Sequence, residues 1–374
     1  MKNILFVILM LVAVNLSAQT SKTLLHNSLT RSYIECVPAI YTGQDPVPLV
    51  IALHGLGDNM TNFSGVGFHA LAQSENFITL YPQAQNSMIG TLWNAGCIYM
   101  GYTLNTNVMD VDFINALIDT TSILYNIDPE RIYVTGFSMG GFMAQRYACE
   151  CSNRVAAIAS VAGTRGRSFT CAPLNPVPVF HLHGTDDATI PMVANPYGID
   201  TDSLIEYWVE FNLCEKIPVF TQLPDIANDS MTVEYYHYAD SASSAETDFY
   251  KVIGADHQWL QTPYNDVDYT TEIWNFFKKH SLSTINPPIH YNIYAPYIYP
   301  NPASDYVQIM NLKYEAAYFS VADSGGRQII ENQKMKSNNK INISSLQDGI
   351  YFVTLYYKDS SKGHVTVKMN KTNQ

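Results

Sequence analysis

Residues 131–141 read Arg-Ile-Tyr-Val-Thr-Gly-Phe-Ser-Met-Gly-Gly and predict a strand, a sharp turn and a helix. The β-branched and aromatic run Ile132 to Thr135 is typical of a buried strand, and an amphipathic segment, Phe142 to Glu150, follows the turn. The pattern Gly-x-Ser-x-Gly needs its glycines because side chains two residues before and after Ser138 would collide with the neighbouring strand and helix. The turn places the Ser138 hydroxyl at a helix N-terminus, where developing negative charge is favoured. Ser138 is therefore a candidate nucleophile, and the alternative is an ordinary helix N-cap.

The composition is that of a globular protein with a weakly charged surface. At 374 residues, and about 150 residues per domain, the chain has room for two or three domains. Hydrophobic residues make up 47% and charged residues 14% of the sequence. The formal net charge of −12, without a basic patch, argues against a nucleic-acid partner.

The first eighteen residues have the pattern of a signal peptide. Lys2 supplies a positive charge, Ile4 to Val14 is almost wholly apolar, and Leu16-Ser17-Ala18 fits a cleavage site. A membrane anchor is the alternative, but the apolar run is short for a bilayer span and no comparable stretch follows. We therefore expect residues 1–18 to direct export and the mature chain to lack a membrane span.

Six cysteines lie in the predicted mature chain, at positions 36, 97, 149, 151, 171 and 214. An exported protein can oxidise them, and Cys171 could close a modest loop with either Cys149 or Cys151. No C-x-x-C spacing occurs, and Cys149-x-Cys151 without nearby histidines is a poor zinc site. We expect no metal site and no cofactor.

Apolar strand patterns alternate with helical patterns through the first 280 residues, which predicts an α/β fold with a mostly parallel sheet covered by helices on both faces. Such sheets place their functional sites at the carboxyl ends of strands. The predicted strands are residues 31–38, 48–53, 77–81, 132–135, 155–162, 178–182, 232–238 and 248–253, and the predicted helices are 110–125, 142–150, 203–213 and 269–279.

The character of the sequence changes after residue 280. Residues 281–298 are rich in proline and tyrosine without a helical period, as expected for an extended linker. Residues 299–374 alternate apolar and polar side chains in short runs between turns, which predicts a small all-β module.

Two further strand ends carry residues that suit Ser138. His183-Gly184-Thr185-Asp186-Asp187 follows one predicted strand, and Gly254-Ala255-Asp256-His257 follows another. Serine, acid and histidine in this order are expected at successive strand tips of a hydrolase sheet. His257 would take the proton of Ser138, and Asp187, or alternatively Asp186, would fix the histidine tautomer. The other histidines in these strand-end loops, His54, His181 and His183, are expected to order loops through backbone hydrogen bonds.

An oxyanion also needs hydrogen-bond donors already aimed at it. The backbone N–H of Met139, directly after Ser138, is one candidate. The second is the N–H of Leu56, because Gly55-Leu56-Gly57 lets the backbone approach a ligand closely. A phosphate-binding loop is the alternative for this stretch, but the G-K-[ST] ending is missing.

Four motifs together resemble one family: His54-Gly55, residues 136–140, residues 183–187 and residues 254–259. They are similar to the extracellular esterases of the polyhydroxybutyrate depolymerase and feruloyl esterase group, over about 250 residues from Arg31. The resemblance implies an α/β-hydrolase esterase domain at residues 19–280 that needs no cofactor. Trp93, Trp259 and His54 are the candidate substrate-binding residues, and core packing is the alternative for the two tryptophans.

The C-terminal module resembles a second known element. Tyr299 to Asp305 and Asp348 to Val353 are similar to the sorting domain of proteins exported by the type IX secretion system, a small β-sandwich. This resemblance implies a secreted or cell-surface protein that uses that machinery. A carbohydrate-binding module is the alternative for the same β pattern.

The sequence thus predicts a secreted serine esterase that hydrolyses feruloyl or acetyl esters of plant cell-wall polysaccharide such as xylan, through an acyl-enzyme. A polyhydroxybutyrate or other polyester depolymerase is the alternative within the same class. A non-catalytic glycan-binding surface protein is the alternative from a different class.

Overall fold

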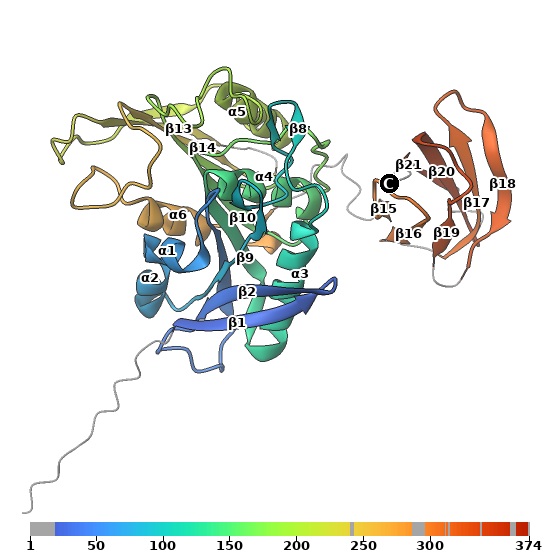
Figure 1. Ribbon diagram of the computed structural model, residues 1–374, viewed down its shortest axis with the longest axis horizontal. Helices are drawn as coiled ribbons and strands as arrows, with labels where there is room; N and C mark the ends of the chain where they lie inside the picture. Colours follow the sequence, from blue (N-terminus) through green and yellow to red (C-terminus); the bar gives the residue numbers. More distant parts are fainter. Residues whose placement is uncertain are drawn as a thin grey trace, which may run out of the picture. The chain divides into compact units, whose positions relative to one another are not determined.

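The computed structural model describes residues 19–239, 243–285, 296–310, 312, 315–336, 339–359 and 364–372. The chain divides into two compact units, residues 1–288 and 289–374 (Figure 1). The predicted signal peptide and residues 286–295 of the predicted linker lie outside the described residues. No described helix is long and apolar enough to cross a membrane.

A ten-stranded sheet forms the centre of the first unit, in the order β1-β2-β4-β3-β9-β10-β11-β14-β13-β12. Its middle strands, from β4 to β14, run parallel, whereas two strands at each edge are antiparallel to their neighbours. The parallel strands are β4 (Ile78–Pro82), β3 (Val47–Leu53), β9 (Ile127–Phe137), β10 (Ala157–Val161), β11 (Val179–Gly184) and β14 (Thr247–Ile253). The edge strands are β1 (Gln19–His26), β2 (Leu29–Cys36), β13 (Thr232–Tyr238) and β12 (Val219–Gln222).

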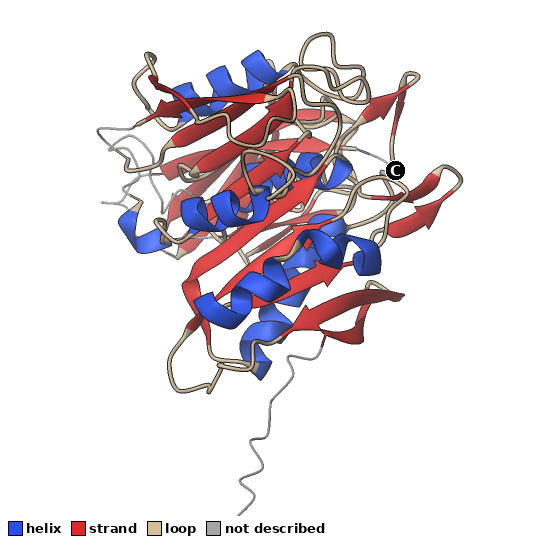
Figure 2. Cartoon of the chain, turned by 90° about the vertical axis from the view of Figure 1, so that its left-hand side faces the viewer, coloured by secondary structure: helices blue, strands red, loops and turns tan. Residues whose placement is uncertain are grey.

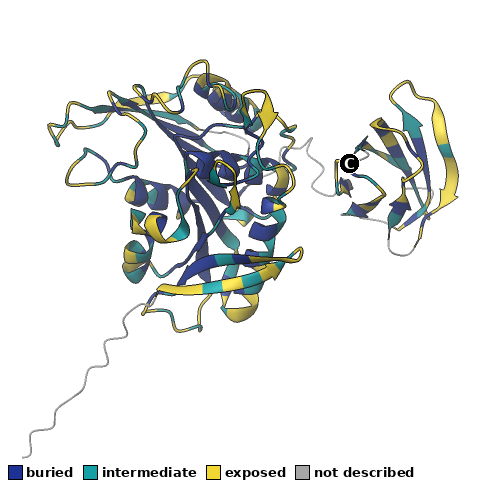
Figure 3. Ribbon diagram, in the orientation of Figure 1, coloured by how far each residue is buried: buried dark blue, intermediate teal, exposed yellow. Residues whose placement is uncertain are grey.

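Helices cover both faces of this sheet (Figure 2). Successive residues of a strand point to opposite faces, so Leu49 and Ile51 of β3 pack with α3, α4 and α5, while Val50 packs with α2 and α6. Because both faces are covered, every residue of β3, β4, β10 and β11 is buried (Figure 3). The helices are α1 (Met60–Phe63), α2 (Phe68–Glu75), α3 (Asp110–Leu124), α4 (Met139–Cys151), α5 (Thr201–Phe211) and α6 (Tyr269–Phe277), with 3-10 turns η1 (Ser64–Val66) and η2 (Leu282–Thr284).

The predicted fold class is confirmed, and the differences are elements that the sequence analysis missed: helices α1 and α2, strands at the edges of the sheet and two short hairpins. Residues 19–26 form strand β1, although their polar composition gave no strand signal. Strand β12 was also missed, because all four of its residues are exposed and carry no burial pattern. Two short hairpins add β5 (Gln85–Ser87) with β6 (Gly90–Leu92), and β7 (Ile98–Tyr99) with β8 (Tyr102–Thr103).

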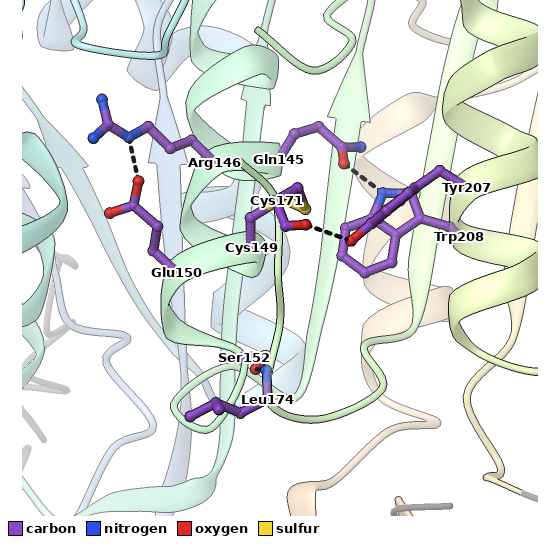
Figure 4. Close-up of a disulfide and its surroundings, with 9 residues drawn as sticks. All are labelled: Gln145, Arg146, Cys149, Glu150, Ser152, Cys171, Leu174, Tyr207 and Trp208. Atoms are coloured by element: carbon purple, nitrogen blue, oxygen red, sulfur yellow. Dashed lines mark hydrogen bonds and ion pairs between the residues drawn. A yellow bond between two sulfur atoms is a disulfide. The ribbon is translucent and has the colours of Figure 1, made fainter. Parts of the chain in front are cut away.

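One disulfide bond joins Cys149 of α4 to Cys171 in the segment after β10 (Figure 4). The sequence left Cys149 and Cys151 open as partners of Cys171, and the structure takes Cys149. Cys151 is a buried thiol instead, as are Cys36 and Cys97.

The second unit is a sandwich of two antiparallel sheets around one apolar core. One sheet contains β15 (Tyr297–Tyr299), β16 (Tyr306–Met310) and β19 (Lys340–Asn342). The other contains β18 (Gln328–Lys334), β17 (Ala316–Asp323), β20 (Gly349–Tyr357) and β21 (His364–Lys371). Side chains such as Val307 and Ile341 from the first sheet and Val321 and Val353 from the second share that core.

A buried ion pair ties the β1–β2 edge of the first unit to α3. Arg31 Nη2 lies 2.7 Å from Asp110 Oδ1, and both side chains are almost completely buried. The second carboxylate oxygen of Asp110 accepts a hydrogen bond from the Asn94 backbone N–H at 2.6 Å. Asp110 therefore fixes the segment that begins at Trp93.

We expect Asp110→Asn to lower the free energy of unfolding of the first unit by about 3 kcal/mol, because it leaves the Arg31 charge buried without a counter-charge. Urea denaturation of the full chain measures the change. Lys216→Gln is the matched control, since Lys216 pairs with Glu210 in an exposed ion pair and its loss should change stability little. Equal small effects of both substitutions would contradict a stabilising role for the buried pair.

Candidate active site

Ser138 lies on a strained turn between β9 and α4. Its backbone has φ 54° and ψ −120°, and its side chain makes no capping hydrogen bond to α4. The alternative of an ordinary N-cap is therefore wrong. A Cβ on Gly140 would lie 2.0 Å from the Leu53 carbonyl oxygen, and one on Gly136 would lie 2.3 Å from the Gly140 carbonyl. The two glycines of the motif are thus required by the close approach of β3, β9 and α4.

Asp187 and His257 meet at the carboxyl ends of β11 and β14. His257 Nδ1 lies 2.7 Å from Asp187 Oδ2, and the Asp187 side chain is fully buried. The other Asp187 oxygen accepts hydrogen bonds from the backbone N–H groups of Thr189 at 2.9 Å and Ile190 at 2.7 Å. Asp186 contacts Thr185 through its side chain instead. The geometry therefore pairs His257 with Asp187 rather than with Asp186.

The surroundings of Asp187 keep it ionised. Burial favours the neutral acid, but hydrogen bonds from His183, from His257 and from the Ile190 backbone outweigh it and hold the pKa of Asp187 well below its usual range. An ionised carboxylate at His257 Nδ1 fixes the proton on that nitrogen, so His257 Nε2 is left as an acceptor.

The ring of His257 packs against Phe137, the residue before Ser138. The centroids of the Phe137 and His257 rings are 4.6 Å apart, and Phe137 directly precedes Ser138. No hydrogen bond joins Ser138 to His257 in the described part of the chain. Such bonds are often long in free enzymes and shorten when substrate binds.

The loop after β3 passes beside Ser138. A Cβ on Gly55 would lie 3.3 Å from Ser138 Cβ, so only glycine lets the backbone come so close. The backbone N–H of Leu56 donates no hydrogen bond within the described residues. The N–H of Met139 opens α4 and has no acceptor four residues back within the helix. The loop of Leu56 thus passes beside Ser138, and neither predicted oxyanion donor has a hydrogen-bond acceptor within the described residues.

Two predicted substrate-binding residues are wrong. His54 is fully buried, with Nδ1 at 2.8 Å from the Gly55 carbonyl and Nε2 accepting from the Ala84 N–H at 3.1 Å. Trp93 is also fully buried, and its Nε1 donates to the His54 carbonyl at 2.9 Å. Both rings order the loop that carries Leu56, so neither can touch a substrate. The structure instead agrees with the alternatives, core packing for Trp93 and a loop ordered through backbone hydrogen bonds for His54.

Trp259 remains on the site side of the molecule. Its side chain is half-buried, and its ring packs edge-on against Phe137 at 6.4 Å between centroids. Its Nε1 donates to Thr270 Oγ1 at 3.1 Å, which holds the indole in place.

The comparisons with known proteins agree with this geometry. Residues 36–197 match the family described as Phospholipase/Carboxylesterase. The first unit is therefore similar to that family over these residues. Residues 297–369 match the family described as Secretion system C-terminal sorting domain, so the second unit is similar to such domains.

Three curated relatives are similar to the first unit. The bifunctional acetylxylan esterase/xylanase XynS20E of Neocallimastix patriciarum is 27% identical over 65% of this chain and 32% of its own length. Feruloyl esterase D of Neurospora crassa is 27% identical over 68% of this chain and 83% of its own. Poly(3-hydroxyalkanoate) depolymerase C of Paucimonas lemoignei is 32% identical over 33% of this chain and 31% of its own. The chain thus spans about a third of the length of the first and the third of these relatives.

A buried network in the esterase-family domain continues from Asp187 into its core. Going inward, His183 Nε2 lies 3.4 Å from Asp187 Oδ2 and 2.7 Å from the Ile190 carbonyl. His183 Nδ1 lies 3.1 Å from His181 Nε2, and His181 Nδ1 lies 2.8 Å from Ser160 Oγ. We call this the His181 network; it ends on Gln145 and Trp208 (Figure 4).

The donor of each hydrogen bond in the His181 network can be assigned by starting from Trp208, which lies at the inner end of the network. Trp208 Nε1 can only donate, so it binds Gln145 Oε1, and the Gln145 amide then donates to Ser160 Oγ. Ser160 donates its own proton to His181 Nδ1, and His181 Nε2 donates to His183 Nδ1. Burial lowers the pKa of His181 well below its usual value, and the nearby His183 contributes a smaller effect in the same direction. This is consistent with a single proton on the His181 ring. The second neighbour of His183 Nδ1, Thr201 Oγ1 at 3.2 Å, can also donate to it.

We expect both His181 and His183 to carry a proton on Nε2 and none on Nδ1. Long-range proton–nitrogen NMR on the histidine-labelled protein reports the tautomers directly. Ser160→Ala should cost about 1–3 kcal/mol of stability, because His181 Nδ1 loses its donor in a dry environment. The control is Ser74→Ala at an exposed position. A proton on His181 Nδ1 in the unchanged protein would contradict the assigned direction.

Proposed function

We propose that the protein is a secreted serine esterase whose catalytic residues are Ser138, Asp187 and His257. The observation that carries the proposal is the uncapped serine on a strained turn, beside a histidine held by a buried, ionised aspartate. The family of the first unit and its esterase relatives support the same reaction class.

The geometry suits a two-step acyl transfer. His257 Nε2 accepts the Ser138 proton while the serine oxygen attacks the ester carbonyl, and the imidazolium that forms is stabilised by Asp187. The N–H groups of Leu56 and Met139 bind the oxyanion. His257 then returns the proton to the leaving alcohol, and a water molecule releases the acyl group by the reverse sequence of proton transfers. The reaction requires no cofactor.

We propose feruloyl or acetyl esters of a plant cell-wall polysaccharide such as xylan as substrates, in keeping with the names of two of the relatives. The hairpin of β5 and β6 favours a substrate with an aromatic or apolar acyl group. It is joined to the loop of Leu56 by a hydrogen bond from the Gly57 N–H to the Thr91 carbonyl at 2.9 Å. At its tip Met88 and Ile89 are exposed, as is Leu56 in the neighbouring loop. A polyester depolymerase is the second candidate, favoured by the depolymerase relative.

The two family matches support the division of the chain into two domains. We propose residues 19–280 as the catalytic domain and the unit that begins with β15 as the domain recognised by a type IX secretion machinery, with a linker between them. Export would begin at the signal peptide of residues 1–18 and place the esterase outside the cell.

Replacement of the nucleophile is the first test. Ser138→Ala should lower kcat for a short-chain nitrophenyl ester by about 10⁵-fold or more, because the acyl-enzyme can no longer form. Far-ultraviolet circular dichroism should be unchanged, and Ser74→Ala should retain full activity. Turnover by the Ser138→Ala variant at the rate of the unchanged protein would refute the assignment of the nucleophile.

A panel of three substrates tests the ester class. We expect release of ferulate from methyl ferulate and of acetate from acetylated xylan, with little soluble product from polyhydroxybutyrate. Hydrolysis of the polyester alone would instead favour the depolymerase. Binding to xylan without hydrolysis of any ester, the nitrophenyl ester included, would favour the non-catalytic glycan-binding protein.

A further inference from the structure

Three side chains that suit a metal ion meet at the edge of the large sheet, away from Ser138. His237 of β13 and Asp248 of β14 are direct cross-strand partners. Glu246 lies two residues before Asp248, so its side chain points to the same face. We call these residues the His237 cluster. The sequence analysis singled out no metal-ligand cluster, because only strand pairing brings these three residues together.

The candidate ligand atoms are close enough to share one ion. One atom from each residue can be chosen so that all three lie within 4.8 Å of one another. His237 Nδ1 is 2.6 Å from Asp248 Oδ1 and 3.9 Å from Glu246 Oε2. Asp248 is almost fully buried, while the side chains of His237 and Glu246 are 26% and 19% exposed. An ion can therefore enter from solvent and still find a buried anionic ligand.

The charge of the cluster attracts a cation. Two carboxylates, those of Asp248 and Glu246, lie beside the single imidazole of His237. The Asp248 side chain is almost fully buried, and a buried negative charge is costly without a full counter-charge. A divalent ion would supply that charge and take the place of the proton that His237 and Asp248 now share.

A second layer of hydrogen bonds orients the ligands. The Tyr235 hydroxyl donates to the free oxygen of Asp248, Oδ2, at 2.7 Å. His280 Nε2 lies 3.1 Å from Glu246 Oε1, and the His280 carbonyl accepts from the Tyr133 hydroxyl at 2.7 Å. Each carboxylate thus has one oxygen held by a neighbour and one directed at His237. Such outer partners fix ligand direction in protein metal sites.

We propose that His237, Glu246 and Asp248 bind a Zn²⁺ ion through one nitrogen and two oxygens, with a water molecule in the fourth position. An imidazole ligand argues against Ca²⁺ and Mg²⁺, which take oxygen ligands in larger numbers. Zinc accepts a mixed set of imidazole and carboxylate ligands in four-coordinate geometry.

The site is separate from the proposed catalytic residues. Asp248 lies at the start of β14 and His257 beyond its end, so the strand alone spans about 17 Å between Asp248 and Ile253. The zinc proposal therefore does not depend on the esterase proposal, and either can fail without the other.

Calorimetric titration of the chelator-treated full-length protein with ZnCl₂ tests the proposal. We expect one zinc ion per chain and a higher melting temperature in its presence. Titration with Co²⁺ should produce visible absorption bands of a four-coordinate site with nitrogen and oxygen ligands. Absence of stoichiometric zinc binding would overturn the proposal and leave the cluster as a hydrogen-bonded ion-pair network.

Matched variants locate the ion. His237→Gln and Glu246→Gln should each abolish stoichiometric zinc binding, while His280→Gln should weaken it about 10–100-fold through loss of ligand orientation. His364→Gln, an exposed histidine of the sorting domain, is the control and should leave the titration unchanged. Glu246→Gln keeps the test decisive if His237→Gln fails to fold. Zinc binding that is unaffected by the Glu246 substitution would place the ion elsewhere and refute the site.

Discussion

The close approach of β3, β9 and α4 is the constraint on which the proposed active site depends. The Leu53 carbonyl leaves no room for a side chain at position 140, and the Gly140 carbonyl leaves none at position 136. These contacts bring α4 down onto the strand ends and force Ser138 into its positive-φ conformation. The same contacts bring the Gly55 backbone against Ser138. The close packing of β3, β9 and α4 thus determines the positions of Ser138, the N-terminus of α4 and the proposed second oxyanion donor.

Hydrogen-bond networks hold the two flanks of that turn. On one flank, Asp110 fixes the segment of Trp93, and Trp93 and His54 in turn hold the loop that carries Leu56. On the other flank, the His181 network reaches the acid that holds His257. Both networks are buried, so removing one member would leave its partner as an unsatisfied buried polar group, which is destabilising. Rigid flanks of this kind are what a preorganised oxyanion site requires.

The parts that the sequence predicted are those encoded by local patterns. Ser138, Asp187 and His257 each follow a strand with a clear apolar run, and parallel strands necessarily bring their carboxyl ends to one edge. Contacts between segments that lie far apart in the sequence could not be predicted from it. Nothing in the sequence distinguishes the buried Trp93 from the half-buried Trp259, because the difference lies in what packs over each ring. The edge strands β1 and β12 were missed since their exposed residues lack an apolar pattern.

The His237 cluster shows that sequence patterns can also miss a group of residues that strand pairing brings together. Glu246 and Asp248 alternate in the sequence like any strand with one polar face, and His237 lies nine residues before Glu246. Only the antiparallel pairing of β13 with β14 sets His237 opposite Asp248, and a shift of one residue would turn the imidazole to the other face. Strand β14 therefore carries polar groups at both ends for different reasons. Its carboxyl end joins the other parallel strands at the proposed catalytic edge, whereas its amino end gains its partners from an antiparallel neighbour and from the residues after α6.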